Sequence, residues 1–169
     1  MTPPYAVERL SREYDRTAFD CGEESLNEYL RRFAGQHADK DISRTYIAVQ
    51  PPSRIVLGYY SLCSGSIDFQ HLPPEVSRKL PRYPLPTAHL ARLAVDRSCQ
   101  GKGLGGLLIL DALRRIIRVA EEIGICAVTV DALHREARDF YLKFGFRRLL
   151  DDEFHLFLLM GTVRRLSLA

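Results

Sequence analysis

The chain has 169 residues, 46% of them hydrophobic and 27% charged, with a formal net charge of +3 at pH 7. This length suits a single domain over residues 1–169 that buries its own core. The four cysteines and five histidines lack the spacing of a metal site, and neither an export signal in Met1–Asp15 nor a membrane-spanning apolar run is present, which predicts a cytoplasmic protein without a metal.

Hydrophobic periodicity predicts short strands and helices in the first half of the chain. They are, in order, a strand at Tyr5–Leu10, a helix at Glu24–Phe33, a short helix through Gln36–Lys40, and strands at Thr45–Val49 and Ile55–Ile67. Gly58 is a candidate bulge in the last of these strands. Pro73-Pro74 can open a short helix through Lys79, and the prolines of Leu80–Pro86 keep the following loop extended.

The second half alternates strands with longer helices. The expected elements are a strand at His89–Val95, a helix at Leu104–Ile123 ended by Gly124, a strand at Ala127–Asp131, a helix at Arg135–Phe144 ended by Gly145, and closing strands at Phe146–Leu149 and Phe154–Thr162. The stretch from His89 to Asp131 is a β–α–β crossover. These elements predict an α/β (α+β) fold with a mixed sheet of roughly six or seven strands and about four helices.

A glycine-rich loop, Gln100–Gly106, lies between a predicted strand and the longest predicted helix. Glycines let the backbone approach a ligand closely, and a helix N-terminus presents N–H groups and partial positive charge. The loop therefore has the character of a phosphate cradle. The alternative is that Cys99, which precedes the loop, is a reactive thiol.

The type of phosphate ligand follows from the glycine spacing. A Walker loop requires Ser or Thr after Gly-Lys, and neither follows Gly101-Lys102. The spacing of Gly101, Gly103 and Gly106 matches a dinucleotide fingerprint loosely, but it stands deep in the chain rather than after the first strand. A third pattern, [QR]-x-x-G-x-[GA], is matched completely by Gln100, Gly103 and Gly105.

With this pattern, Arg92–Leu113 resembles motif A of the GNAT acetyltransferases, and the order of elements is similar to that of the GNAT fold. The resemblance implies acetyl-CoA as the cofactor, with its pantetheine arm in a gap between two splayed central strands. It implies a cofactor site made of Leu93, Ala94, Val95, Gln100, Gly101, Lys102, Gly103, Leu104, Gly105 and Gly106, with Phe140 and Phe144 as a wall.

A second segment, Asp139–Phe146, resembles motif B of the same family, in which a helix tyrosine precedes a Gly-Phe turn. Tyr141 is the candidate catalytic residue, because a phenol is protonated at neutral pH and can donate to the departing thiolate of coenzyme A. The alternative is that Tyr141 is a core aromatic residue among its phenylalanine neighbours.

A general base is harder to identify in the sequence. The strand before the loop reads His89-Leu90-Ala91-Arg92-Leu93 and has no carboxylate where many GNAT enzymes have a Glu; His89 could serve, or it could be structural. Without a base, an α-amine of pKa about 7.7–8.0 is an easier acceptor than a lysine amine of pKa about 10.4.

The N-terminal half resembles the GNAT toxins of type II toxin–antitoxin modules, which acetylate aminoacyl-tRNA. The resemblance is carried by Phe19-Asp20-Cys21-Gly22 with Leu26 and Leu30, by Thr45–Val49, by Gly58–Leu62, and by Pro81–Pro86 leading into Arg92–Asp96. It implies transfer of acetyl to the α-amino group of aminoacyl-tRNA and a block of translation. It further implies a ribbon–helix–helix antitoxin and a homodimer.

Basic side chains would then hold the tRNA by phosphate contacts. The candidates are Arg78, Lys79, Arg82 and Arg92, with Arg31, Arg32 and Lys40 as an extension of the patch. The chain contains 20 Arg and 4 Lys, and a GC-rich genome explains that bias as well as tRNA binding does. The alternatives for function are an acetyltransferase for a small-molecule amine or a protein N-terminus, and a non-catalytic domain that only senses acetyl-CoA.

Overall fold

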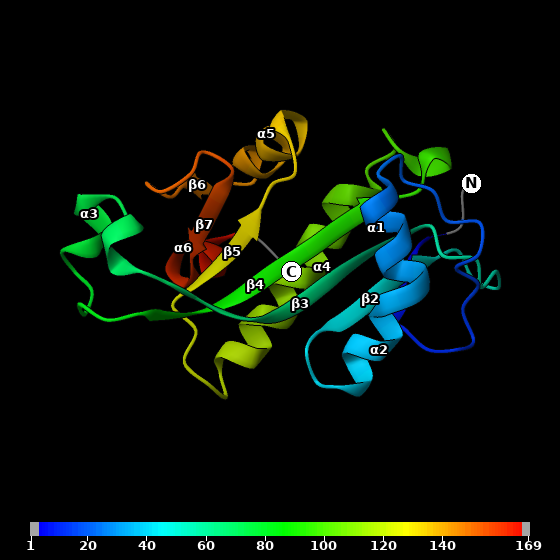
Figure 1. The fold of residues 1–169 in the computed structure, drawn as a ribbon, viewed down its shortest axis with the longest axis horizontal. Coiled ribbons are helices and arrows are strands. Elements are labelled where there is room, and N and C mark those ends of the chain that lie inside the picture. The colour runs from blue at the N-terminus through cyan, green and yellow to red at the C-terminus, as the bar shows by residue number, and fades with distance from the viewer. Residues whose placement is uncertain (1–3, 167–169) are drawn as a thin grey trace. The chain divides into compact units, whose positions relative to one another are not determined.

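A computed structural model describes residues 4–166 of the chain (Figure 1). Within these residues one mixed sheet has the strand order β1-β2-β3-β4-β5-β7-β6. The strands are β1 Ala6–Arg9, β2 Arg44–Val49, β3 Gly58–Ile67, β4 Leu85–Val95, β5 Ala127–Asp131, β6 Arg147–Arg148 and β7 His155–Leu159. The predicted α/β fold with a mixed sheet is confirmed, and β4 and β5 are the parallel pair that the predicted crossover requires.

The residues form two compact units, and strands β3 and β4 each run through both. Unit 1 comprises the chain up to Cys63 together with Ala91–Ala112, and unit 2 comprises Ser64–Leu90 together with the chain from Leu113 onward. No helix in the described part of the chain is long and apolar enough to cross a membrane.

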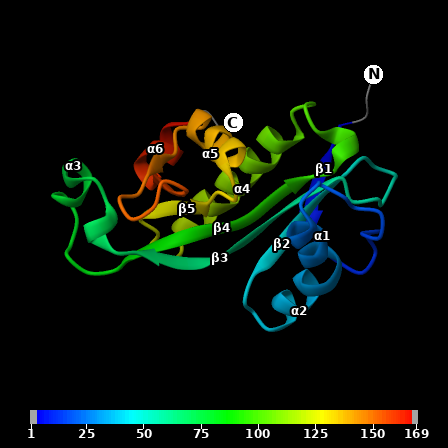
Figure 2. The ribbon, with the colours of Figure 1, turned by 45° about the horizontal axis from the view of Figure 1, so that its top comes forward.

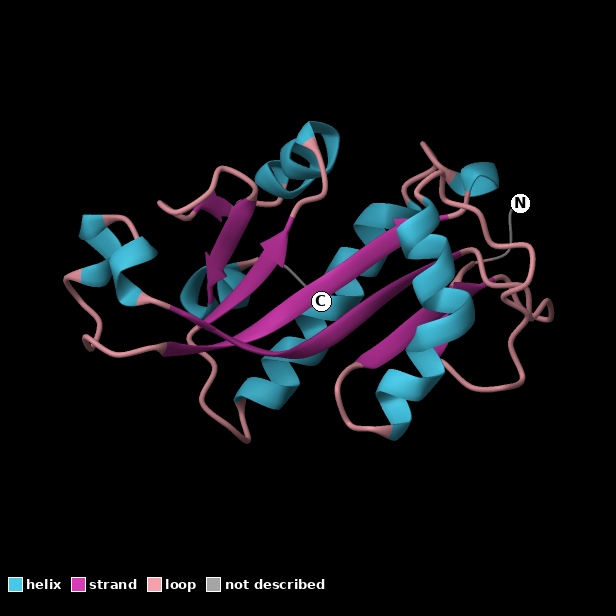
Figure 3. Ribbon diagram, in the orientation of Figure 1, coloured by secondary structure: helices cyan, strands magenta, loops and turns pink. Residues whose placement is uncertain are grey.

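The first helical region is one continuous run rather than two separate helices (Figure 3). It consists of α1 Glu24–Glu28, a π-helical turn at Tyr29–Phe33, and α2 Ala34–Asp39. The expected second short helix therefore starts at Ala34 rather than Gln36 and follows Phe33 directly, with Gly35 inside it. The run lies along β2 (Figures 1 and 2).

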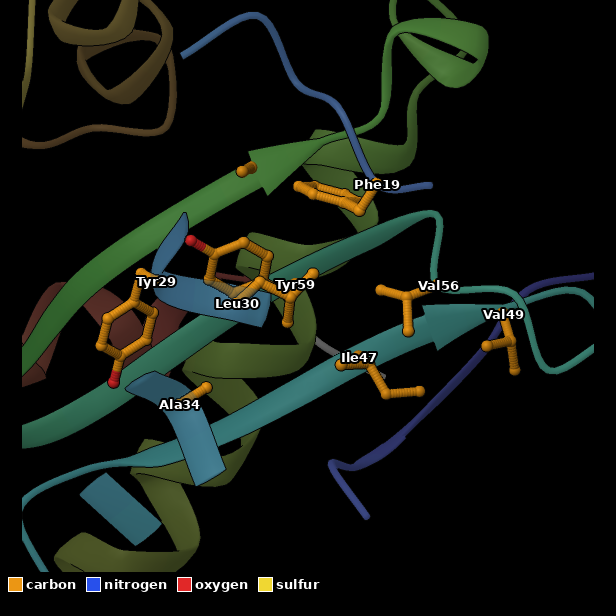
Figure 4. Close-up of a cluster of buried hydrophobic side chains, with 9 residues drawn as sticks. Phe19, Tyr29, Leu30, Ala34, Ile47, Val49, Val56 and Tyr59 are labelled. Atoms are coloured by element: carbon orange, nitrogen blue, oxygen red, sulfur yellow. The ribbon is translucent and has the colours of Figure 1, made fainter. Parts of the chain in front are cut away.

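Unit 1 has its core between this helical run and the strands β2 and β3 (Figure 4). Leu30 and Ala34 on the helix and Ile47 and Tyr59 on the strands are all fully buried. The rings of Tyr29 and Tyr59 stack with centroids 6.3 Å apart. Removing a buried side chain such as Leu30 would cost about 2–5 kcal/mol, so this core fixes the position of the helical run.

Gly58 serves a close approach of two elements and is not a bulge. It pairs with Ala48 in regular antiparallel register. A Cβ at this position would lie 3.0 Å from Leu108 Cδ1 and 3.2 Å from the Ala94 carbonyl oxygen. The glycine therefore lets α4 (Leu104–Ala120) lie close against the sheet.

Unit 2 contains the β5–β7 pair, the short helix α3 at Pro74–Ser77, and α5 at Arg135–Lys143. Its last helix is α6 at Met160–Arg165, where the sequence predicts a closing strand that runs to Thr162; this prediction was wrong. The apolar residues of β7 continue into α6, so the sequence shows no clear boundary between strand and helix. In α6 the buried residues are Met160 and Val163, which are three positions apart as in a helix.

Candidate active site

The glycine-rich loop after β4 has the geometry of an anion cradle. Gly101 has φ +77° and Gly103 has φ +88°, a left-handed conformation that side chains with a Cβ rarely adopt. A Cβ at either position would meet open space, so the backbone conformation and not crowding requires glycine. The first helical bond of α4 runs from the Leu107 N–H to the Gly103 carbonyl. The amides of the first helical turn therefore have no acceptor within the helix and suit a ligand such as phosphate.

The base of this loop is held by Asp96 and Gln100. The Asp96 carboxylate accepts hydrogen bonds from the Ser98 N–H at 3.0 Å and from the Asp20 N–H at 2.9 Å. Gln100 Nε2 donates to the carbonyls of Val95 and Cys21, both at 2.9 Å. The Gln100 side chain, predicted to take part in cofactor binding, thus bridges the loop to a segment 79 residues earlier.

Asn27 completes this contact from α1. Its side chain is 2% exposed; Oδ1 accepts from the Cys21 N–H at 2.8 Å, and Nδ2 donates to Asp20 Oδ1 at 3.0 Å. We call Asp20, Cys21, Asn27, Asp96 and Gln100 the clasp. The Phe19–Gly22 motif is apparent in the sequence, whereas Asn27 was not predicted; its signal is a polar residue at a buried position of a helix.

Strand β4 extends past its partner β5. The two strands pair from Thr87–Ala127 to Leu90–Val130, whereas β4 continues to Val95. Leu93 and Val95 therefore lie beyond the pairing, where their main-chain groups suit an extended ligand. Ala94 instead faces inward, being 5% exposed in the core of unit 1.

Tyr141 lies on α5 in an aromatic cluster of unit 2. It is 7% exposed, and its ring makes edge contacts with Phe140 and Phe146 at centroid distances of 5.3 and 5.6 Å. Burial raises the pKa of the Tyr141 phenol above its ordinary value. The hydroxyl therefore stays protonated across the neutral range and remains a hydrogen-bond donor. Phe140 and Phe144 also contact each other, at 5.1 Å.

The predicted tRNA-binding residues lie in two different environments. Arg78, Lys79 and Arg82 are exposed around the loop after α3. Arg92 is half-buried, with its guanidinium 3.6 Å from the ring centroid of the buried Tyr29. This stacking covers one face of the guanidinium and leaves its edge for hydrogen bonds.

The remaining candidates divide between packing and a polar pocket. Cys99 is buried, at 7% exposed, which does not favour the reactive thiol considered above. His89 Nδ1 lies 2.8 Å from Thr129 Oγ1 in unit 2. Among the described residues, no group of three or more His, Cys, Asp and Glu side chains could hold a metal ion.

Comparison with known proteins decides the family. Residues 79–156 match the family model described as an acetyltransferase (GNAT) domain. The chain is 42% identical over 161 residues, 95% of each chain, to the tRNA-acetylating toxin of Mycobacterium tuberculosis (strain ATCC 25618 / H37Rv). The chain belongs to the GNAT acetyltransferases. It is an N-acetyltransferase with acetyl-CoA as its cofactor.

Two solved structures are similar to this chain over nearly its whole length. AtaT complexed with acetyl-methionyl-tRNAfMet has a TM-score of 0.89 and 34% identity, with 95% of this chain and 98% of that chain covered. A tyrosine-to-phenylalanine mutant of the AtaT toxin, bound to the C-terminus of the antitoxin AtaR and acetyl-CoA, has a TM-score of 0.82 and 32% identity, with 95% and 96% covered.

Proposed function

We propose that this acetyltransferase is the toxin of a type II toxin–antitoxin module that acetylates the α-amino group of aminoacyl-tRNA and so blocks translation. The observation that carries the proposal is the 42% identity over 95% of the chain to a tRNA-acetylating toxin. The structure of AtaT with acetyl-methionyl-tRNAfMet supports the same acceptor.

The residues of the loop fit the cofactor. The amides of Gly101–Gly106 at the N-terminus of α4 would hold the pyrophosphate, with Gln100 fixing the loop through its bonds to Cys21 and Val95. Leu93 and Val95 would pair with the pantetheine arm beyond the end of β5. Phe140 and Phe144 of α5 would form an apolar wall. Acetyl-CoA supplies the acetyl group as a thioester.

Tyr141 would act as the donor to the leaving sulfur. Because burial raises its pKa, the phenol stays protonated and donates its O–H most strongly to an atom that is gaining negative charge. Phe140 and Phe146 fix the orientation of the ring by edge contacts.

Basic side chains would hold the acceptor stem through its phosphates. Arg78, Lys79 and Arg82 are exposed and grouped within a few residues of one another, so they offer sequence-independent contacts. Arg92 would contribute the free edge of its guanidinium while Tyr29 holds its plane. A ribbon–helix–helix antitoxin, a homodimer and a cytoplasmic location belong to the same proposal.

The test is to incubate the protein with labelled acetyl-CoA and charged total tRNA and to locate the label. We expect the label on the amino group of aminoacyl-tRNA, sensitive to alkaline cleavage of the ester. Label on free amines or protein N-termini, with none on tRNA, would support the alternative acceptor and overturn the toxin proposal.

Tyr141→Phe tests the donor in the same assay. We expect a loss of kcat of about 100-fold, the lower end of the range for acid–base groups, with the KM for acetyl-CoA unchanged. Tyr14→Phe is the matched control, because it also removes one phenolic hydroxyl, whose partner is the exposed Glu8. A Tyr141→Phe variant as active as Tyr14→Phe and the wild-type protein would exclude Tyr141 as the donor.

A further inference from the structure

Unit 2 contains a polar pocket of about 290 Å³ that the cofactor site and Tyr141 do not account for. Its walls come from the end of β3 and the segment that follows it, from β4, from β5, and from the segment leading into β7. The titratable side chains that face it are Asp68, His71, His89, Asp131, Asp151 and His155. Among the described residues that line the pocket none is lysine or arginine, so its permanently charged side chains are the three carboxylates.

The centre of the pocket is an ordered row of side chains across β4, β5 and β7. Thr129 Oγ1 lies 2.8 Å from His89 Nδ1, and His89 Nε2 lies 3.4 Å from Asp131 Oδ2. On its other side, Asp131 Oδ1 lies 3.7 Å from His155 Nε2. The register of the strands produces this row, because His89 pairs with Thr129 and Asp131 pairs with His155.

The row continues from His155 toward solvent. His155 Nδ1 lies 2.9 Å from Asp151 Oδ2, and the same oxygen lies 3.9 Å from His71 Nδ1. Imidazoles and carboxylates thus alternate over five side chains, from the partly buried His89 to the more exposed His71. The contacts at 3.7 and 3.9 Å are ion-pair distances, so the row couples the charges of these five groups electrostatically.

The electrostatics favour an ionised carboxylate at the centre. The hydrogen bond with His89 lowers the pKa of Asp131, and the hydrogen bond with Asp151 raises the pKa of His155. The Asp131 side chain is 59% exposed, so it can reach a ligand. Its neighbour His89 stands four residues before Leu93 in the same strand.

We propose that this pocket receives the protonated amino group of the acceptor, with Asp131 as its ionic contact and His89 as the group that takes its proton. The assignment rests on the proposed function for the identity of the amine. Thr129 Oγ1 fixes the ring through its 2.8 Å contact with Nδ1, so Nε2 is the ring nitrogen that faces Asp131 and the pocket. In this proposal Nδ1 carries the hydrogen of the neutral ring, and Nε2 donates to Asp131 only after it has taken the proton. The general base that the sequence analysis left open is then a strand histidine with an aspartate beside it.

The proton and electron balance is simple. The ammonium passes one proton to His89 Nε2, directly or through one water, and Asp131 stabilises the imidazolium that results. The freed lone pair of the amine forms a bond to the acetyl carbon while the acetyl–sulfur bond breaks, its electron pair going to sulfur. The nitrogen loses one further proton, and the sulfur gains one.

The first experiment measures kcat/KM for aminoacyl-tRNA from about pH 6 to about pH 9. We expect His89→Gln to lose about 10- to 100-fold near pH 7 and to recover toward the wild-type rate as the pH rises, because the free amine then needs no base. Glu122→Gln, an exposed carboxylate outside the pocket, is the control and should follow the wild-type profile. A defect in folding would lower kcat/KM by the same factor at every pH. Such a uniform loss, or a wild-type pH profile for His89→Gln, would overturn the role of His89 as the base.

The second experiment needs neither acetyl-CoA nor tRNA. Protein labelled with ¹⁵N-histidine is titrated with methioninamide and, in parallel, with N-acetylmethioninamide, which has no basic amine. We expect only methioninamide to shift the ring nitrogens of His89 and His155, and Asp131→Asn to weaken this response at least about 10-fold. Equal shifts with both compounds, or none, would exclude an amine site.

The two proposals fail in different ways. Wild-type protein that does not label aminoacyl-tRNA but binds methioninamide through His89 would overturn the toxin proposal and leave the amine pocket in place. Wild-type protein that labels aminoacyl-tRNA, combined with an unchanged pH profile for His89→Gln, would overturn the pocket alone.

Discussion

Replacing Asn27 with alanine tests the inference that the clasp on the glycine-rich loop is held from α1. The substitution removes the hydrogen bond from the Cys21 N–H at 2.8 Å and the one to Asp20 Oδ1 at 3.0 Å. Each is worth about 1 kcal/mol net, and leaving the Cys21 N–H without its acceptor adds about 1 kcal/mol. Alanine returns about 0.6 kcal/mol through its better helix propensity. The expected loss of unfolding free energy is therefore about 2 kcal/mol.

The same substitution should also weaken acetyl-CoA binding. Cys21 connects Asn27 to the loop, since its carbonyl accepts from Gln100 Nε2 at 2.9 Å. A looser Cys21 segment lets the loop leave its binding conformation more often, and we expect the Kd for acetyl-CoA to rise about 3- to 10-fold. Urea unfolding monitored by circular dichroism gives the first quantity, and isothermal titration calorimetry gives the second.

Gln36→Ala is the matched control, because it removes an exposed amide from the same helical run. It should change the unfolding free energy by less than about 0.5 kcal/mol. Two results would refute the reasoning: an Asn27→Ala variant as stable as this control, or a destabilised variant whose affinity for acetyl-CoA is unchanged.

Further predictions concern the glycine-rich loop, the loss of stability at acid pH, and the exposed basic residues that would bind tRNA. Gly103→Ala, forced to φ +88°, should cost about 1–2 kcal/mol in acetyl-CoA affinity by calorimetry, whereas Gly124→Ala, in open space without a positive φ, should be neutral. Burial opposes ionisation of Asp96, but hydrogen bonds from Ser98 and the Asp20 N–H outweigh it and lower its pKa. The stability this gives is present above about pH 4 and lost as the pH falls through the lowered value, so Asp96→Asn should flatten the fall of Tm with acid. Equal acid sensitivity of the two proteins would contradict this. Neutralising three exposed basic residues together should weaken tRNA binding and reduce its salt slope by about 2–3, measured by filter binding; an unchanged slope would exclude them as phosphate contacts. These are Arg78, Lys79 and Arg82.

Local features of the sequence were sufficient to predict β5 and α5. The strand Ala127–Asp131 has the predicted bounds, and α5 ends at Lys143, one residue before the predicted end, with Gly145 following at φ +98°. These elements are set by contiguous hydrophobic periodicity and by glycine stops, both of which are readable in a short window.

Strand and helix ends that depend on distant contacts were predicted less well. Strand β4 begins at Leu85 rather than His89, because its first residues pair with β5 from Thr87 onward. The helix α4 ends at Ala120 rather than Ile123, and α6 was read as strand. In these places pairing and packing, not propensity, decide where the element starts or stops.

By itself, the sequence determined the donor side of the reaction. The pattern of Gln100, Gly103 and Gly105 between strand and helix, and the tyrosine before the Gly-Phe turn, are local and need no fold to be seen. Only the tertiary structure decided the rest. Hydrogen bonds in the clasp join Asn27 to Cys21, and Cys21 to Gln100, which lies 79 residues further along the chain. The His89–Asp131–His155 row forms because β4, β5 and β7 pair in register. Such groups are scattered in sequence, since hydrogen-bonded neighbours across strands share no fixed spacing along the chain.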